Sequence, residues 1–143
     1  MLFTECKLKG AFVVEMQKHQ DSRGFFARCW CAREMSRLGL NTNICQANTS
    51  FSKSQGTLRG MHFQQSPYQE TKFVRCTRGA VFDVIIDLRP ESETFRQWMA
   101  VELSAENYKM LYVPEDFAHG FLTLQENCEV TYLVTQYHAP EAE

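Results

Sequence analysis

The chain has 143 residues, which suits one domain large enough to bury a core. Its 44% apolar and 22% charged residues are ordinary for a globular protein, and a formal charge of −2 excludes binding of nucleic acid through an overall basic field. No apolar run approaches the roughly 20 residues that cross a bilayer, and the first residues lack the pattern of a signal peptide. The six cysteines form no C-x-x-C pair, so we expect free thiols and a cytoplasmic protein.

The N-terminal part of the chain predicts two short strands joined by a turn. Residues 10–15 are rich in β-forming side chains, and the polar residues 17–22 favour a turn. A glycine then leads into an aromatic strand that runs to residue 30. Arg23 lies at the entry to this strand.

The next segment predicts one helix and a polar extended stretch. Residues 32–39 carry apolar side chains three positions apart and end in Gly39, which is typical of a short helix with a glycine stop. Residues 43–51 are extended and polar. The period of two places Gln46 and Asn48 on the same side of this strand, where they are either solvated or line a polar cavity.

Residues 56–64 combine an arginine and a histidine in a glycine-punctuated extended run. The guanidinium of Arg59 suits a phosphate, and His62 can take and return a proton near neutral pH. The same pattern also fits an ordinary strand with a surface arginine and a hydrogen-bonded histidine. Strict alternation places the two side chains on opposite faces, so a shared site requires an irregularity at Gly60 or phosphate binding at the mouth of a barrel.

The second half of the chain predicts closely spaced strands with short turns. Asp83 lies inside an apolar strand and needs a partner, either an Arg or Lys in a structural pair or a group in a functional site. Nine or ten short strands with one helix predict an all-β antiparallel sandwich or barrel of the jelly-roll type. The predicted strands cover residues 72–77, 80–88, 98–103, 110–113, 120–124 and 129–136.

Seven motifs in order resemble the dTDP-4-dehydrorhamnose 3,5-epimerase family. The resemblance covers nearly all of the chain and implies a cupin jelly roll, also called a double-stranded β-helix, with one or two short helices in a homodimer. It implies an isomerase that uses no metal or other cofactor and acts on a nucleotide-linked 4-keto-6-deoxy sugar. The motifs occupy residues 23–26, 58–64, 72–75, 79–89, 103–107, 113–121 and 137–141.

The same resemblance implies a role for each polar residue of the site. The C4 ketone of the sugar acidifies the protons on C3 and C5, so one group removes a proton and another returns it on the opposite face. By resemblance His62 is the base, Tyr132 is the acid and Lys72 stabilises the enolate. The implied substrate contacts are Arg23 and Arg59 to the pyrophosphate, Gln46 and Asn48 to the nucleotide or sugar, and His119 and Glu143.

The chain departs from the family at several positions. Arg28 replaces a glutamate of the substrate-binding strand, which leaves the nucleotide and sugar open. The family's aspartate that orients the catalytic histidine lies beyond residue 143, so we expect a single epimerase domain, residues 1–143, without the C-terminal segment. Asp83 could replace that aspartate. His119 follows a proline at the spacing of a cupin metal ligand, but Gln64 stands where a second histidine is needed, so we expect no metal.

Three functions therefore remain open. The first is a 3,5-epimerase, or a 3-epimerase if only one proton is exchanged. The second is a 3,4-ketoisomerase on the same fold, and the third is a cupin that binds nucleotide sugars without turnover.

Overall fold

The computed structural model describes all 143 residues and contains twelve strands and two short helices. None of the helices is both long and apolar enough to cross a membrane. The strands are β1 (Leu2–Glu5), β2 (Phe12–Glu15), β3 (His19–Asp21), β4 (Gly24–Phe26), β5 (Gln46–Ser52), β6 (Leu58–His62), β7 (Lys72–Arg78), β8 (Ala80–Asp87), β9 (Trp98–Ser104), β10 (Met110–Val113), β11 (Phe117–Thr123) and β12 (Cys128–Val134). The helices are α1 (Ala32–Ser36) and the 3-10 helix η1 (Pro140–Ala142).

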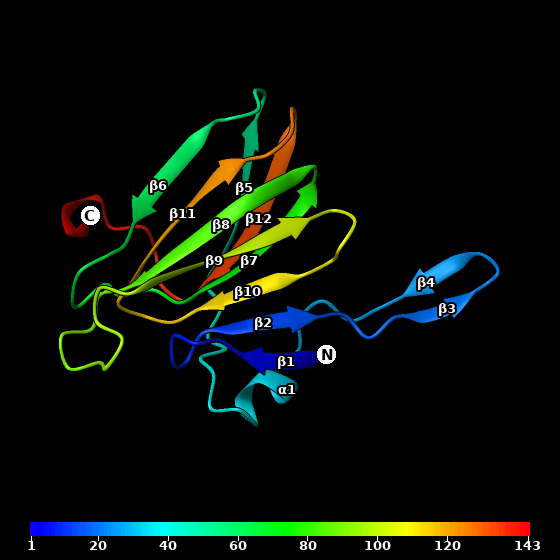
Figure 1. Cartoon of the computed structure of the whole chain (residues 1–143). Coiled ribbons are helices and arrows are strands. Elements are labelled where there is room, and N and C mark those ends of the chain that lie inside the picture. The colour runs from blue at the N-terminus through cyan, green and yellow to red at the C-terminus, as the bar shows by residue number, and fades with distance from the viewer.

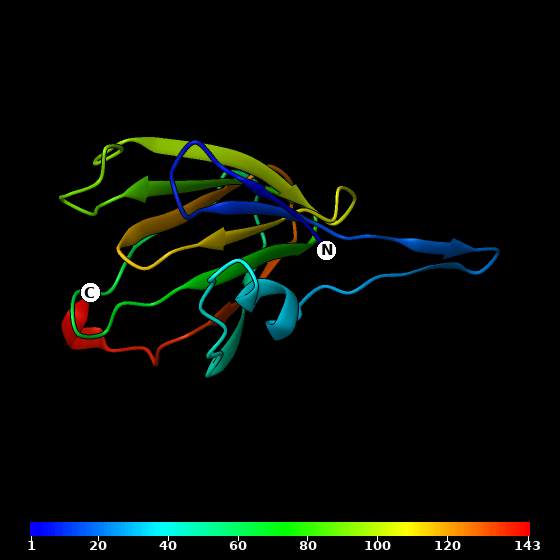
Figure 2. The same ribbon diagram turned by 90° about the horizontal axis from the view of Figure 1, so that it is seen from below.

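Two antiparallel sheets pack face to face (Figure 1). The larger sheet has the order β1-β2-β10-β7-β12-β5, and the smaller one has the order β6-β11-β8-β9. Figure 2 shows these two layers from below, with α1 packed outside the larger sheet. The predicted all-β cupin jelly roll is confirmed.

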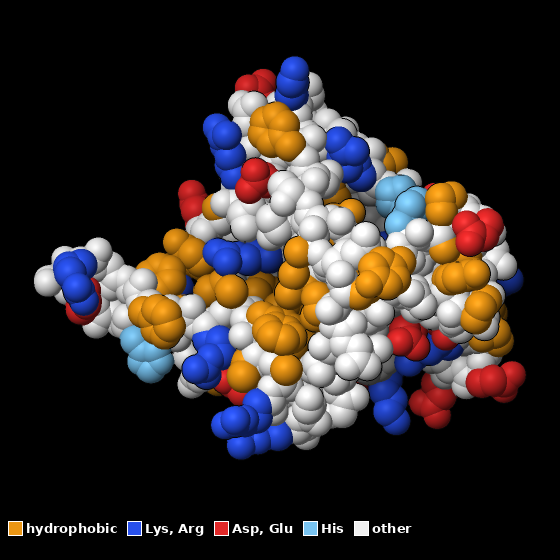
Figure 3. All heavy atoms as spheres, turned by 180° about the vertical axis from the view of Figure 1, so that it is seen from behind, with side chains coloured by type: hydrophobic (Ala, Val, Ile, Leu, Met, Phe, Trp, Pro, Cys, Tyr) orange, Lys and Arg blue, Asp and Glu red, His pale blue; other side chains and the backbone are white.

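The remaining two strands form a hairpin that projects from the body. Strands β3 and β4 pair only with each other, and Figures 1 and 2 show them extending to one side. The base of the hairpin is held by Tyr108, whose ring meets Phe25 edge to face at 5.0 Å and lies 4.0 Å from the Lys18 ammonium. In the view from behind, apolar side chains gather at this base and across the middle of the face (Figure 3).

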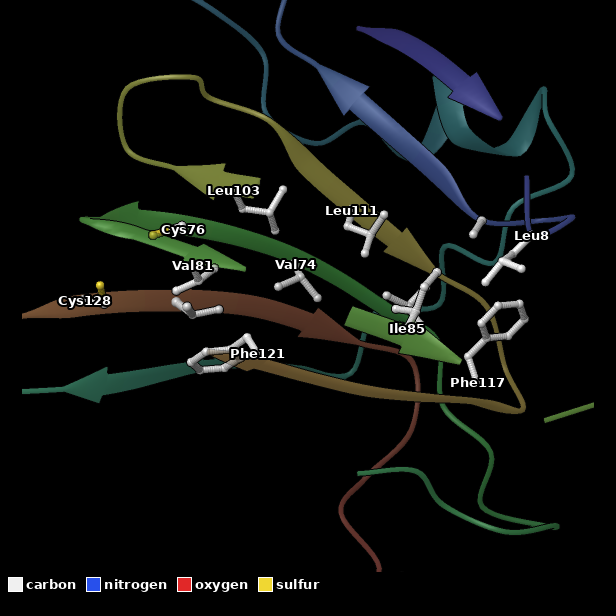
Figure 4. Close-up of a cluster of buried hydrophobic side chains, with 13 residues drawn as sticks. Leu8, Val74, Cys76, Val81, Ile85, Leu103, Leu111, Phe117, Phe121 and Cys128 are labelled. Atoms are coloured by element: carbon white, nitrogen blue, oxygen red, sulfur yellow. The ribbon is translucent and has the colours of Figure 1, made fainter. Parts of the chain in front are cut away.

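The main core lies between the sheets and follows from the alternation of each strand. In β7, Val74 and Cys76 point inward, whereas Phe73 points to a second cluster that packs under Met35 of α1. Figure 4 shows inward side chains from both sheets meeting. The core residues are Leu8, Ala11, Val74, Cys76, Val81, Ile85, Leu103, Leu111, Val113, Phe117, Phe121, Cys128 and Val130.

One buried carboxylate organises a loop at the edge of the core. Asp87, at the end of β8, accepts hydrogen bonds from the backbone and side chain of Arg89 and from the hydroxyls of Ser92 and Thr94. This cluster holds the connection to β9. These hydrogen bonds compensate for the burial of Asp87, the second aspartate of the apolar strand β8 after Asp83.

Several predicted boundaries were wrong. Residues 17–22, predicted as a turn, include β3, because the hairpin pairs polar residues with β4 outside the core. The aromatic strand ends at Phe26 instead of residue 30, and β1 was missed. The helix ends at Ser36 and not at residue 39, because Leu38 and Gly39 donate to the carbonyls three residues before them and form a turn; Gly39 ends this turn with a φ of +72°.

Candidate functional site

A cavity of about 120 Å³ lies between the two sheets, because strands of both contribute to its walls. The larger sheet supplies Lys72 from β7 and Tyr132 from β12, and the smaller sheet supplies Arg59, His62 and His119. Both sheets are needed, so no single stretch of sequence contains the cavity. The lining residues are Ser50, Arg59, His62, Lys72, His119, Gly120, Phe121 and Tyr132.

An irregularity in β6 brings Arg59 and His62 to the same cavity. His62 pairs with His119 and Arg59 pairs with Phe121, so two residues of β6 lie opposite one residue of β11. Gly60 takes part in this bulge with φ of +119°, and a Cβ there would lie 2.6 Å from the Cα of β11's central glycine. Only glycine fits such an approach. The predicted irregularity at Gly60 is confirmed.

The buried Asp83 contacts His119, which corrects the expectation that it orients His62. Each carboxylate oxygen of Asp83 lies 3.0 Å from Nε2 of His119, and both side chains are buried. The partner is therefore a histidine of the cavity and not the Arg or Lys of a structural pair. A carboxylate only accepts hydrogen bonds, so Nε2 donates. Asp83 thereby fixes the ring of His119.

Lys72, which lines the cavity, is paired with a carboxylate. Its Nζ lies 2.9 Å from Oε1 of Glu70, and the two side chains are only 9% and 13% exposed. Nearby, burial raises the pKa of Tyr132, the negative charge of Glu70 raises it further, and Arg59 opposes the shift. The raised pKa favours the protonated form of Tyr132, which is the form that an acid requires.

Arg59 is fixed at the edge of the cavity by hydrogen bonds to β5. Its Nε donates to Ser52 Oγ at 3.0 Å, and its Nη2 donates to the carbonyl of Phe51 at 3.0 Å. The remaining N–H groups of the guanidinium are left for a ligand. A fixed, exposed fork of this kind suits a phosphate.

The two predicted polar residues of β5 share one face, as predicted. Asn48 pairs directly with Tyr132, and Gln46 lies two residues earlier. The side chain of Gln46 accepts a hydrogen bond from the backbone N–H of His138 at 3.2 Å. Asn48 therefore borders the proposed acid, whereas Gln46 holds the C-terminal segment.

Two predicted substrate contacts lie away from the cavity in this chain. Arg23 is at the tip of the hairpin, where its side chain is 88% exposed and is paired only with Asp21. Glu143 lies 3.8 Å from His138 at the surface. Arg28, at the position that departs from the family, forms an ion pair of 2.7 Å with Glu34 of α1.

Sequence reasoning missed Ser50 and Glu70. Ser50 lies two residues after Asn48 in β5, so the period of two that was applied to Gln46 and Asn48 predicts it. Glu70 lies in the loop before β7, where no strand period applies, and no local signal indicates it. Gln64 has a structural task. Its amide holds the C-terminal segment and the loop before β7 by hydrogen bonds to the backbone of residues 68, 137 and 139.

No three His, Cys, Asp or Glu side chains lie close enough together to hold a metal ion. The cavity can instead perform acid–base chemistry with its own side chains. It contains two histidines, one buried lysine and a tyrosine beside an arginine that is open to an anion.

Comparison with known proteins gives consistent results. The sequence pattern of the dTDP-4-dehydrorhamnose 3,5-epimerase family matches residues 5–143. The chain is 42% identical over 144 residues to the dTDP-4-dehydrorhamnose 3,5-epimerase of Salmonella typhimurium, covering 100% of this chain and 78% of that protein.

Solved structures agree with the sequence comparison. The dTDP-4-dehydrorhamnose 3,5-epimerase of Bacillus anthracis, crystallised with TDP and PPi bound, matches with a TM-score of 0.95 at 39% identity, over 99% of this chain and 81% of that one. The dTDP-6-deoxy-D-glucose-3,5-epimerase of Legionella pneumophila, in complex with dTDP-4-keto-L-rhamnose, matches with a TM-score of 0.91 at 36% identity, over 99% and 74% of the two chains.

Proposed function

The chain belongs to the dTDP-4-dehydrorhamnose 3,5-epimerase family, and from this premise we propose that its cavity epimerises C3 and C5 of a dTDP-linked 4-keto-6-deoxy sugar. The observation that carries the proposal is that His62, Tyr132 and Lys72 line one cavity although they come from three strands in two sheets. A base, an acid and a cation are the three groups that the reaction needs.

Each group has a defined task in this proposal. His62 removes the proton from a carbon beside the C4 ketone, and the electron pair of the broken C–H bond moves into an enolate. The ammonium of Lys72 stabilises the negative charge on the enolate oxygen, which exists only after proton removal and so favours the transition state over the bound ketone. Tyr132 returns a proton to the opposite face of the ring, and its raised pKa keeps that proton available.

Arg59 gives the nucleotide a fixed point of attachment. We propose that its free N–H groups bind the pyrophosphate, while Ser50 of the cavity wall and Asn48, which pairs with Tyr132, contact the sugar or the nucleotide. His119, held by Asp83, forms the floor beside His62.

Exchange of hydrogen with solvent tests the reaction directly. Wild-type protein with dTDP-4-keto-6-deoxyglucose in D₂O is expected to incorporate deuterium at C3 and C5, as NMR of the sugar shows. His62→Asn and Tyr132→Phe are expected to lower turnover by about 10²- to 10⁴-fold each, with dTDP binding retained in calorimetry. Tyr112→Phe, a buried tyrosine outside the cavity, is the matched control.

The same spectra separate the alternatives. Deuterium at C3 alone indicates a 3-epimerase, and a carbonyl moved from C4 to C3 indicates a ketoisomerase. Binding of the nucleotide sugar without any exchange, with enzyme saturated by substrate, contradicts catalysis and leaves only a binding role.

We propose further that the protein acts as a homodimer in which the hairpin of one copy reaches the site of the other. Arg23, Phe25 and Phe26 are exposed on the hairpin, which has no sheet of its own to cover it. An apolar hollow of about 220 Å³ opens beside Trp30 and Arg75, where the Nε1 and Nε donors of these two residues are buried without a hydrogen-bond partner. A second chain can supply the apolar cover of this hollow.

Complementation between variants tests this arrangement. Light scattering is expected to give twice the mass of the chain. A mixture of His62→Asn and Arg23→Ala chains, each weak alone, is expected to regain activity, because one mixed site combines an intact His62 with the partner's intact Arg23. A monomer in solution, or no gain on mixing, contradicts the proposal.

We also propose a cytoplasmic location. The thiols of Cys76 and Cys128 are buried and donate hydrogen bonds to backbone carbonyls, so the fold uses them in the reduced form that this compartment maintains. Cell fractionation with an antibody to the protein tests this location.

A further inference from the structure

Glu70 is a nearly buried carboxylate that pairs with Lys72 of the cavity wall, and the epimerase mechanism assigns it no task. Its side chain is 13% exposed, and its charged partner is the Lys72 ammonium at 2.9 Å. Burying a carboxylate is unfavourable without such a partner. Because Lys72 is also the cation of the proposed reaction, its pairing with Glu70 affects how the enolate is stabilised.

The backbone around Glu70 is held rigidly. Thr71 donates its N–H to Thr135 Oγ1 at 2.9 Å, and its carbonyl accepts the N–H of Thr135 at 3.2 Å. On the other side, the Gln64 amide donates to the carbonyl of Tyr68 at 2.7 Å. The carboxylate is thus presented to Lys72 from a loop that is fixed at both ends.

We propose that Glu70 is a positioning residue of the epimerase site, which aims the Lys72 ammonium at the sugar carbonyl and places a negative charge beside Tyr132. This inference rests on the proposed function. An ammonium has three N–H donors. When Glu70 takes one, the direction of the other two is set, and the flexible lysine side chain no longer has to be ordered by substrate.

The negative charge has a second effect, on the acid. Two charged groups change the pKa of Tyr132. Burial raises this pKa most, the charge of Glu70 raises it further, and the charge of Arg59 lowers it. Loss of the Glu70 charge therefore favours the phenolate, which cannot donate a proton. The charged and titratable groups around the phenol are Arg59, His62 and His119 of the smaller sheet, Lys72 of the larger one, and Glu70 of the loop before β7.

Three substitutions separate position from charge. Glu70→Gln keeps an oxygen for Lys72 but loses the charge, Glu70→Asp keeps the charge but shortens the reach, and Glu70→Ala loses both. Glu129→Gln is the matched control. The partly buried carboxylate of Glu129 lies on β12, the strand of Tyr132, and accepts a hydrogen bond from Thr77, which is not a residue of the cavity.

The kinetics are expected to follow these roles. Glu70→Ala and Glu70→Asp lower kcat by about 10- to 100-fold with little change in KM, because misdirection of Lys72 acts on the enolate and not on nucleotide binding. Glu70→Gln retains more of kcat, but its pH profile loses activity at a lower pH on the alkaline side. A merely structural residue would lower the melting temperature without moving this limb, as we expect for Glu129→Gln.

A titration of Tyr132 provides a readout that does not need activity. The ultraviolet difference spectrum of tyrosinate, referenced to the same protein carrying Tyr132→Phe, is expected to show Tyr132 ionising at lower pH in Glu70→Gln than in wild type. An unchanged titration, or a kcat of Glu70→Ala within twofold of wild type, overturns the inference. If wild-type protein exchanges no deuterium, the proposed function fails instead, and the titration still decides whether the charge of Glu70 acts on Tyr132.

Discussion

The contact between Asp83 and His119 allows a quantitative prediction about stability. Asp83 is fully buried, and its two oxygens lie at equal distances of 3.0 Å from one nitrogen, so the two contacts share a single N–H donor. They therefore count as one charge-assisted hydrogen bond. Such a bond contributes about 1.5–3 kcal/mol, roughly twice the value for neutral partners.

The substitution Asp83→Asn keeps the shape and one oxygen acceptor but removes the charge. We expect about half of the interaction to be lost, that is, about 0.8–1.5 kcal/mol in the free energy of unfolding. For a chain of this size the melting temperature should fall by about 2–5 °C. Asp116→Asn is the control, because that residue is exposed at φ of +61°, a conformation that asparagine also accepts.

Urea unfolding of a double-mutant cycle isolates the pair. Asp83→Asn, His119→Gln and the double variant are compared at pH 7. The sum of the stability losses in the two single variants should exceed the loss in the double variant by about 1 kcal/mol. Additive losses would show that the two side chains do not interact in the folded protein. A destabilisation of Asp83→Asn no larger than that of Asp116→Asn would contradict the buried hydrogen bond as well.

Three other outcomes follow from the fold. In urea unfolding, Gly60→Ala should destabilise the protein by more than the roughly 1 kcal/mol expected for Gly39→Ala. Both glycines have positive φ, but Gly60 lies against another backbone whereas Gly39 faces open space. Equal losses would contradict the close contact. Burial alone would raise the pKa of Asp87, but the hydrogen bonds that it accepts outweigh burial and hold the pKa well below its usual value. Ionised Asp87 therefore stabilises the fold above its unfolded pKa of about 3.9, and the stability gap between wild type and Asp87→Asn should be full at pH 7 and shrink as the pH falls below about 4; a constant gap refutes this. Burial raises the pKa of Cys76 to about 11, so mass spectrometry after alkylation at pH 8 should find the exposed Cys29 modified well before Cys76, and equal rates would contradict the burial.

Much of the fold could be predicted from local pattern. Alternating apolar residues with short turns indicated an antiparallel jelly roll, and the period of two placed Gln46 and Asn48 on one face, as the pairing of β5 with β12 shows. One segment that failed was short and polar. Strand β3 has no buried residue, so its only support is pairing with β4, and that pairing leaves no apolar signal.

The candidate site divides in the same way. The motif around residues 58–62 indicated an arginine and a histidine with a glycine irregularity between them, and both residues line the cavity. The sequence did not reveal that Asp83 would meet His119 and not His62. In the structure, β11 lies between β6 and β8, so the histidine of β11 is the one beside Asp83.

The amino-acid sequence alone determined which residues form strands, which faces of those strands are apolar, and the family to which the chain belongs. These are properties of neighbouring residues and of motifs read along one chain. Only the tertiary structure decided the partner of Asp83, the pairing of Glu70 with Lys72, and the distance of Arg23 from the cavity of its own chain. Each of these depends on which distant segments of the chain lie side by side in the fold. The periodicity of a single strand shows which face is apolar but not which strand lies next to it.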